Sequence, residues 1–354
     1  MAKLGDYTYI KTGKLDANAS SDNGRYPFFT CSKESLLIDT YSYDCECVLV
    51  AGNGDLNVKY YLGKFDAYQR TYIIESNNKE KLLVRYLYYF LDKYVETLRE
   101  QSIGGVIKYI KLGNLTEAYI PLPSLDEQRK IAAVLDKVSD LIAKRKQQLD
   151  KLDELVKSRF IEMFDNIKDE DALINLCTFI DYRGKTPEKA ESGLPFITAK
   201  NIKMHHMSFD TQEFISKETY EKVMTRGFPR VGDVVFTTEA PLGNVCRIPY
   251  IETEFYIGQR IITMQTEQLE PAYLEYALSS DEFKRKIAEK SSGSTVTGIR
   301  SKLLEQLTIP VPSRALQRQF AVFVEHADKS KLAIQMSFDK LEILKKALMQ
   351  KYFG

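Results

Sequence analysis

The chain contains one segment twice. Residues 120–164 align without a gap on residues 309–353, 189 positions further along, and 13 of the 45 paired positions are identical. The first copy begins IPLPSLDEQRKI and the second begins IPVPSRALQRQF, and the tripeptide DKL recurs near the end of both copies. A gapless duplication of this length predicts that two distant segments have the same structure.

Each copy predicts an extended stretch followed by one long helix. The prolines of the IPLP motif favour an extended backbone, and Ser124 with Glu127 forms a capping box that predicts a helix start at about Leu125. Because no Gly or Pro follows until well past Phe164, roughly 40 residues can form a rod of ~60 Å at 1.5 Å per residue. Such a rod needs support along its length.

A heptad seam of apolar side chains along each predicted helix indicates what would support it. The seam is interrupted at Arg145 and Arg159 in the first copy, and at Lys331 and Lys345 in the second. We expect the two helices to pack on each other, antiparallel because a whole domain separates them in the chain. Two unrelated amphipathic core helices are the alternative. The seam residues are Ile131, Leu135, Val138, Ile142, Leu149, Leu152, Val156 and Met163, and then Phe320, Val324, Ala327, Ile334, Phe338, Leu341, Leu348 and Tyr352.

The segments before the two repeats also match, more loosely. CECVLVAGNGDLNV from Cys45 and GDVVFTTEAPLGNV from Gly232 are β-rich runs with a Gly/Asn loop, and each leads to a Gln-Arg pair and more strand. YLYYFL likewise parallels YLEYAL. The sequence therefore predicts an α/β (α+β) fold with two similar globular domains. These are residues 1–119 and 165–310, each followed by a long helix in residues 120–164 and 311–354.

Composition indicates a globular protein of a reducing compartment. The hydrophobic fraction is 44% and the charged fraction 28%, and no apolar run approaches the ~20 residues that span a bilayer. The first residues, MAKLGDYTYIKTGK, do not form a signal peptide. The five cysteines lack CxxC spacing, so they are expected to be free and mostly buried thiols. We expect a cytoplasmic protein without a membrane segment.

The net charge is only +1, whereas nucleic-acid-binding proteins usually have an excess of Lys and Arg. Residues 1–119 contain 15 basic and 15 acidic side chains, and residues 165–310 contain 18 basic and 22 acidic ones. Any DNA-binding surface must therefore be local.

The sequence lacks the motifs of the enzyme classes that act on DNA or nucleotides. It has no Asn/Asp-Pro-Pro-aromatic tetrapeptide of an amino-methyltransferase and no GxxxxGK[ST] phosphate loop. Asp126 and Glu127 lie near a lysine, as nuclease carboxylates do, but the repeat has Ala315 and Leu316 in their place. We therefore predict no catalytic residue and no bound metal or cofactor in this chain.

Two further features have a structural and a functional interpretation. His205 and His206 would point to opposite faces of a strand, and without partners at ligand spacing we expect solvated or DNA-facing loop histidines rather than a metal site. AGNGDLN around Asn53 faintly resembles a phosphate-binding loop, but a tight hairpin turn is favoured.

Taken together, the motifs resemble those of the specificity subunits of type I DNA restriction-modification enzymes. They comprise the PxPSxxxQR helix starts, the DKL-containing helix ends and four phrases of the second domain: DYRGKTP, LPFITAKNIK, GDVVFTTEAPLGNV and GSTVTGIRSKLLEQLTIPVP. The resemblance covers the whole chain. The first domain departs from it, because KTGKLDANASSDNGRYPFFT stands where an RGKTP-like and an FITAKNI-like phrase are expected.

The resemblance implies a non-catalytic subunit in which each globular domain reads one half of a split double-stranded DNA target, with the paired helices as a spacer. It also implies assembly with methyltransferase (M) subunits and motor-nuclease (R) subunits. S-adenosylmethionine, ATP and Mg²⁺ would bind to those partners. The alternative is an adaptor whose globular domains bind protein and whose helices form a dimerisation rod, and its main support is the near-neutral charge.

Candidate DNA contacts are the polar residues of the predicted loops. Arg and Lys suit guanine, Asn and Gln suit adenine, and Lys, Arg, Ser and Thr anchor phosphates. The second domain offers Arg183, Lys185, Thr186, Lys200, Asn201, Lys203, Thr237, Thr238, Asn244, Thr295, Thr297 and Arg300. The first offers Lys11, Lys14, Asn18, Arg25, Tyr26, Asn53 and Lys108.

The Gln-Arg pairs are candidates of a different kind. Gln69-Arg70 and Gln259-Arg260 lie within apolar, strand-like runs. A structural hydrogen-bonding role and a base-reading role are both open for them.

Overall fold

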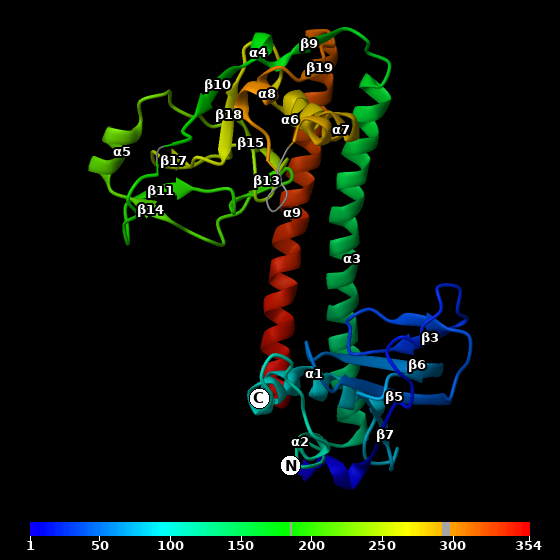
Figure 1. The fold of residues 1–354 in the computed structure, drawn as a ribbon. Helices are drawn as coiled ribbons and strands as arrows, with labels where there is room; N and C mark the ends of the chain where they lie inside the picture. The colour runs from blue at the N-terminus through cyan, green and yellow to red at the C-terminus, as the bar shows by residue number, and fades with distance from the viewer. Residues whose placement is uncertain (185, 292–297) are drawn as a thin grey trace. The chain divides into compact units, whose positions relative to one another are not determined.

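The computed structural model describes residues 1–184, 186–291 and 298–354 (Figure 1). It is a mixed α/β structure made of two compact units. The first unit comprises Met1–Gln147 and Ile334–Gly354, and the second comprises Gln148–Ala333. Each unit therefore contains one globular domain and a part of both long helices.

The two long helices are α3 (Leu125–Phe164, green in Figure 1) and α9 (Arg314–Phe353, orange to red), each of 40 residues. The hydroxyl of Ser124 accepts a hydrogen bond from the N–H of Glu127 (3.3 Å), as a helix start at Leu125 requires. The predicted start and length of α3 are confirmed.

The predicted seam packs in the antiparallel sense within each unit. In the first unit Ile131 and Leu135, near the start of α3, share a core with Met349 at the end of α9. In the second unit the later α3 residue Val156 shares a core with Phe320, near the start of α9. The expected antiparallel helix pair is confirmed.

Charged residues that interrupt the seam have polar partners. Arg145 Nε donates to the hydroxyl of Ser337 (3.1 Å), and Lys331 forms an ion pair with Asp153 (2.5 Å). The interruptions are therefore compatible with continuous helix packing.

The first domain is built on a six-stranded sheet in the order β2-β7-β5-β6-β3-β4. Helix α1 (Val84–Gln101) packs on it, and Val48, Ile74 and Leu87 are among the fully buried residues between them. The strands are β2 Thr8–Thr12, β3 Tyr26–Phe29, β4 Leu36–Ile38, β5 Tyr43–Ala51, β6 Val58–Ala67 and β7 Thr71–Ser76. The remaining elements are β1 Ala2–Lys3, the 3-10 helix η1 Leu4–Tyr7, α2 Leu112–Thr116 and β8 Tyr119–Ile120, and β1 pairs with β8.

The second domain repeats this topology with its sheet in two parts, β10-β18-β15-β16 and β14-β11-β17. Its strands are β9 Glu170–Ala172, β10 Thr178–Asp181, β11 Leu194–Ile197, β12 Ile202–Lys203, β13 His206–Met207, β14 Phe214–Ile215, β15 Val234–Thr237, β16 Val245–Arg247, β17 Tyr256–Ile257, β18 Ile261–Gln265 and β19 Thr308–Pro310. Its helices are α4 Leu173–Leu176, α5 Lys217–Val223, α6 Pro271–Ser279, α7 Asp281–Lys290 and α8 Ser301–Glu305.

Strand register identifies equivalent residues of the two domains. Ala51 pairs with Thr71 at the end of β5, as Thr237 pairs with Ile261 at the end of β15. The parallel pair β3–β6 corresponds to β11–β17, and the pair β1–β8 to β9–β19. The two domains are therefore similar, as the sequence predicted.

The repeated glutamine joins each long helix to its domain by the same hydrogen bonds. Gln128 and Gln317 are at most 1% exposed. Gln128 accepts from the N–H of Leu83 (3.0 Å), and Gln317 accepts from the N–H of Glu270 (2.8 Å). Each also donates to the second proline carbonyl of its own motif (3.0 and 2.8 Å). Since Leu83 and Glu270 directly precede α1 and α6, the motif fixes equivalent helices.

In each domain, one buried tyrosine contacts both the proline motif before one long helix and the end of the other long helix. The hydroxyls of Tyr86 and Tyr273 donate to the first proline carbonyl of the repeats, at 3.0 and 2.5 Å. Phe353, near the end of α9, packs against Tyr86 with ring centroids 5.2 Å apart, and Phe164 of α3 packs against Tyr273 at 4.8 Å. Helix α3 therefore begins at the first domain and ends in the core of the second domain, and α9 begins at the second domain and ends at the core of the first.

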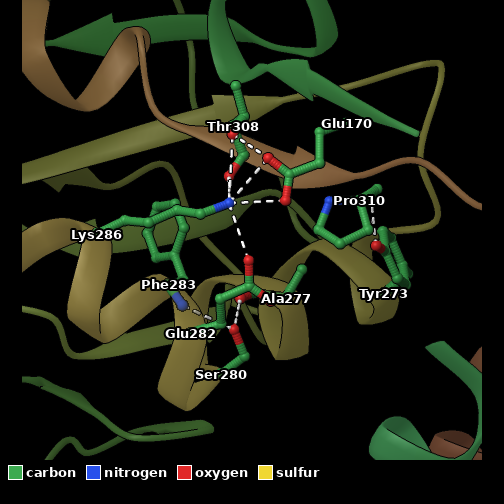
Figure 2. A network of polar contacts seen from close by, with 9 residues as sticks. All are labelled: Glu170, Tyr273, Ala277, Ser280, Glu282, Phe283, Lys286, Thr308 and Pro310. Atoms are coloured by element: carbon green, nitrogen blue, oxygen red, sulfur yellow. Dashed lines mark hydrogen bonds and ion pairs between the residues drawn. The ribbon is translucent and has the colours of Figure 1, made fainter. Parts of the chain in front are cut away.

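Figure 2 shows how Lys286 of α7 is held against the β9–β19 pair. Its ammonium contacts both carboxylate oxygens of Glu170 (2.8 and 2.9 Å), the carbonyl of Thr308 (3.1 Å) and Glu282 (3.1 Å). Burial lowers the pKa of Lys286, but the two carboxylates outweigh it and raise that pKa. Burial likewise opposes ionisation of Glu170, yet Lys286 and Thr308 lower its pKa.

All five cysteines are free, as predicted, and Cys47, Cys177 and Cys246 are buried. Across the described residues, no helix combines the length and the apolar character that crossing a membrane requires.

Candidate nucleic-acid interface

The Gln-Arg pair forms a turn in both domains. Gln69 and Arg70 connect β6 to β7, and Gln259 and Arg260 connect β17 to β18. The expectation that these pairs lie inside strands is wrong, because both occupy turns between strands. A turn at a strand end projects its side chains beyond the sheet, where a large ligand can reach them.

In the first domain, neighbouring loops meet at this turn. The N–H of Gly52 donates to the carbonyl of Arg70 (2.8 Å), and the N–H of Gly54 donates to that of Lys108 (2.9 Å). AGNGDLN contains the connection between the antiparallel strands β5 and β6, so the predicted hairpin is present, but residues 52–57 form a loop longer than the expected tight turn. The nominated residues gathered at this end of the sheet are Lys14, Asn53, Gln69, Arg70 and Lys108, all exposed except the half-buried Asn53.

The other nominated residues of the first domain lie elsewhere. Lys11 on β2 forms an ion pair with Glu75 (2.6 Å), and although burial lowers its pKa, Glu75 raises it above the ordinary value. Tyr26 at the start of β3 packs against Tyr41 with centroids 4.9 Å apart. Asn18 and Arg25 have exposed side chains.

In the second domain, a pocket of about 270 Å³ adjoins the turn. Four nominated residues line it, namely Thr186, Lys200, Gln259 and Arg260. Arg260 is paired with Glu239 at 2.8 Å, and both side chains are substantially exposed. The pocket therefore combines hydrogen-bond donors of the kind that contact bases and phosphates.

Four nominated polar side chains of the second domain are hydrogen-bonded within it. Buried Asn201 accepts from Thr198 (2.9 Å) and donates to the carbonyls of Ser208 and Thr211 (3.0 and 2.8 Å). The others also bond to backbone carbonyls: Thr237 to Pro241 (2.6 Å), Thr238 to Arg260 (3.2 Å) and Asn244 to Ile202 (2.8 Å). These residues support the loops around the turn.

Arg183 is held by Asp181, to which its Nε and Nη2 donate at 2.9 and 2.7 Å. Burial raises the pKa of Asp181, but Arg183 and Ser301 outweigh this and lower it. Lys203 and Arg300 are exposed. Lys185, Thr295 and Thr297 lie outside the described residues.

His206 is exposed, as expected, but His205 is only 23% exposed and is held by other side chains of its own domain. Its ring stacks on Tyr276 with centroids 4.2 Å apart, and Nδ1 lies 2.9 Å from the fully buried carboxylate of Glu275. Glu275 also accepts from Arg247 Nε (2.5 Å), whose Nη2 donates to Asp328 on α9 (2.7 Å). This network anchors the β12–β13 turn to α6 and α9.

One likeness between the domains was missed in the sequence. YPFFT from Tyr26 stands on β3 where LPFIT from Leu194 stands on β11, and both strands pair in parallel with the strand before the Gln-Arg turn. The first domain therefore has a counterpart of the FITAKNI-like phrase, and the shared Pro-Phe-apolar-Thr pattern was the signal. Glu239 was also missed, because only basic, amide and hydroxyl side chains were sought.

The described part of the chain contains no cluster of three or more His, Cys, Asp or Glu residues arranged to hold a metal ion.

Residues 1–154 and 174–342 match the family described as the type I restriction modification DNA specificity domain. The chain belongs to this family. The match includes most of both globular domains and parts of both long helices. It does not favour the adaptor alternative.

Curated relatives of the specificity family agree with this assignment. The Escherichia coli type I restriction enzyme EcoDI specificity subunit is 39% identical over 157 residues, which are 44% of this chain and 34% of that protein. This match thus spans about a third of that relative. The Methanocaldococcus jannaschii MjaVIII specificity subunit is 22% identical over 375 aligned positions, covering 98% of this chain and 84% of that protein.

Two solved structures from type I restriction-modification systems have the same fold. A type I restriction-modification S subunit from M. genitalium is similar with a TM-score of 0.68 at 17% identity, covering 100% of this chain and 95% of that one. A chain from a structure of type I restriction-modification complex assembly has a TM-score of 0.54 at 18% identity, covering 99% and 96%.

Proposed function

We propose that this chain is the DNA sequence-specificity subunit of a type I restriction-modification complex. Each globular domain reads one half of a bipartite double-stranded target, and the antiparallel helices set the spacing of the two halves. The observation that carries the proposal is the duplicated Gln-Arg turn, which presents an exposed arginine at equivalent positions of two equivalent domains.

The chemistry of these turns suits DNA. Arginine donates two parallel hydrogen bonds to guanine O6 and N7, and exposed lysines nearby neutralise phosphates. Lys14 and Lys108 adjoin the first turn and Lys200 the second. Because the chain as a whole is nearly neutral, such local groups have to supply the attraction.

The catalytic activities belong, in this proposal, to partner subunits. M subunits dock on the long helices and bind S-adenosylmethionine, and R subunits bind ATP and Mg²⁺. The present chain supplies no catalytic group, and the complex works in the cytoplasm, where it meets DNA.

The deciding experiment is to co-express the chain with the adjacently encoded methyltransferase subunit in an unmethylated host and map N6-methyladenine across the genome. One split motif with a constant gap is the expected result. A soluble complex that produces no new methylation would contradict the proposal.

A further inference from the structure

Asn53 and Glu239 occupy equivalent positions beside the two Gln-Arg turns. They follow Gly52 and Thr238, whose N–H groups donate to the carbonyls of Arg70 and Arg260 at 2.8 and 2.9 Å. Each also pairs with the segment before the next short helix, Asn53 with Tyr109 and Glu239 with Gly298. One backbone scaffold thus holds an amide in the first domain and a carboxylate in the second.

The carboxylate of Glu239 and the guanidinium of Arg260 form an exposed pair. Glu239 Oε1 lies 2.8 Å from Arg260 Nε in an ion pair, and the side chains are 40% and 53% exposed. A guanidinium has five N–H donors, and the Nη groups of Arg260 have no hydrogen-bond partner in the described parts of the chain. The pair can therefore keep its internal contact and still bind a ligand.

Buried Thr238 fixes the backbone of both residues. Its N–H and its hydroxyl both donate to the carbonyl of Arg260, at 2.9 and 3.2 Å, and it directly precedes Glu239. Its own carbonyl accepts from the N–H of Ile299 (3.0 Å). The acceptor and the donor therefore stand side by side before any DNA arrives, which lowers the cost of ordering them on binding.

We propose that Glu239 and Arg260 together read one C·G base pair in the second half of the DNA target. Glu239 accepts a hydrogen bond from the cytosine amino group, and Arg260 donates to O6 and N7 of guanine in the major groove. In a C·G pair the cytosine amino group and guanine O6 are adjacent, because the amino group donates a hydrogen bond to O6. The neighbouring acceptor and donor of the protein match that arrangement.

This inference rests on the proposed function and adds the base pair that is read. It also distinguishes the domains, since the equivalent Asn53 beside Arg70 has an amide that suits adenine. Glu239 and Arg260 should therefore affect the second half-site alone.

The test measures DNA binding by the purified complex of the full chain with its methyltransferase subunits. Duplexes carry each of the four base pairs at every position of the second half-site, and the wild type is compared with E239Q, R260A and the double variant. E289Q, a change at an exposed acidic residue of α7, is the matched control, and thermal unfolding of each complex establishes that it is folded.

In the wild type we expect one position to prefer C·G over the other pairs by about 5- to 150-fold. E239Q and R260A should each reduce that preference at the same position, and the double variant should add little to R260A, while the first half-site and E289Q stay unchanged. Unaltered discrimination in folded E239Q and R260A, or effects at unrelated positions, would overturn the inference while leaving the proposed function intact. Failure of the wild type to select any split motif would overturn both.

Discussion

Gln128 of α3 accepts a hydrogen bond from the backbone N–H of Leu83 (3.0 Å), which directly precedes α1. The bond joins this long helix to a residue of the first domain that lies 45 positions earlier in the chain. Its counterpart between Gln317 and Glu270 explains why the glutamine of the PxPSxxxQR motif occurs in both repeats.

Replacement of Gln128 by Ala should lower the free energy of unfolding by about 1–3 kcal/mol, because it removes a buried side chain and leaves the part-buried N–H of Leu83 without its partner. Chemical denaturation of the full chain measures this. Gln147→Ala, at an exposed position of the same helix, should change the free energy by less than about 0.5 kcal/mol. Equal effects of the two substitutions would contradict a stabilising role of the Gln128 hydrogen bonds.

The buried Glu275 should be more costly to remove alone than together with its partner. Burial opposes the charge of Arg247, but Glu275 and Asp328 hold its pKa above the ordinary value. Glu275→Leu removes one of these carboxylates from a buried pair and should cost about 3 kcal/mol, whereas Glu275→Leu with Arg247→Leu should recover part of the loss. Thermal unfolding compares the variants, and a double variant less stable than the single one would exclude this explanation.

The Lys286–Glu170 contact should make stability depend on pH in a defined direction. Because the folded-state pKa of Glu170 is lowered from 4.5, its contribution is complete above that value and is lost as pH falls through the folded pKa. Because the pKa of Lys286 is raised from 10.5, its contribution is complete below that value and is lost as pH rises through the folded pKa.

Lys286→Met should therefore cost about 1 kcal/mol near neutral pH, and the difference from the wild type should shrink below about pH 4. Denaturant titrations between pH 7 and pH 3 measure it, with Lys290→Met on the same helix as the control. A difference that does not vary with pH would mean that packing of the lysine stem, not its charge, is responsible.

Arg70→Ala and Arg260→Ala should each weaken recognition of a different half-site without unfolding the protein. Loss of a bidentate base contact costs about 1–3 kcal/mol of discrimination. Methylation maps of the two variants should show degeneracy in opposite halves of the motif. Aggregation of Arg260→Ala would instead indicate a structural role for this turn residue.

Lys200→Ala should weaken DNA binding about equally for all sequences, because an exposed lysine at the pocket rim suits a phosphate. The slope of log K against log salt concentration should fall in magnitude by about 1. Affinity measured from 50 to 200 mM salt tests this, and a sequence-dependent loss would assign Lys200 to base contact instead.

Repetition made the fold predictable from sequence. The IPLPS motif, the capping serine and the apolar seam predict α3 from Leu125, because proline geometry, capping and heptad spacing are local properties. The two-domain plan follows from the same duplication. The first domain was harder, since YPFFT shares with LPFIT only the Pro, Phe and Thr of a five-residue segment.

The candidate site was less predictable because it depends on long-range contacts. Asn201 is a residue type that can hydrogen-bond to a DNA base, yet its side-chain amide is hydrogen-bonded to Thr198, Ser208 and Thr211. His205 was expected to face water or DNA, but Glu275, 70 residues later, binds it. Conversely, Glu239 is a candidate DNA contact only because it pairs with Arg260, and no local sequence pattern links the two residues.

The packing of Phe353 against Tyr86 has a consequence for synthesis. Ribosomes make Tyr86 long before Phe353, so the amino-terminal core waits for residues 334–354 before it is closed. A nonsense codon that removes only this late segment would therefore destabilise the domain that is translated first. Recognition would then be impaired in the half of the DNA target that the first domain reads.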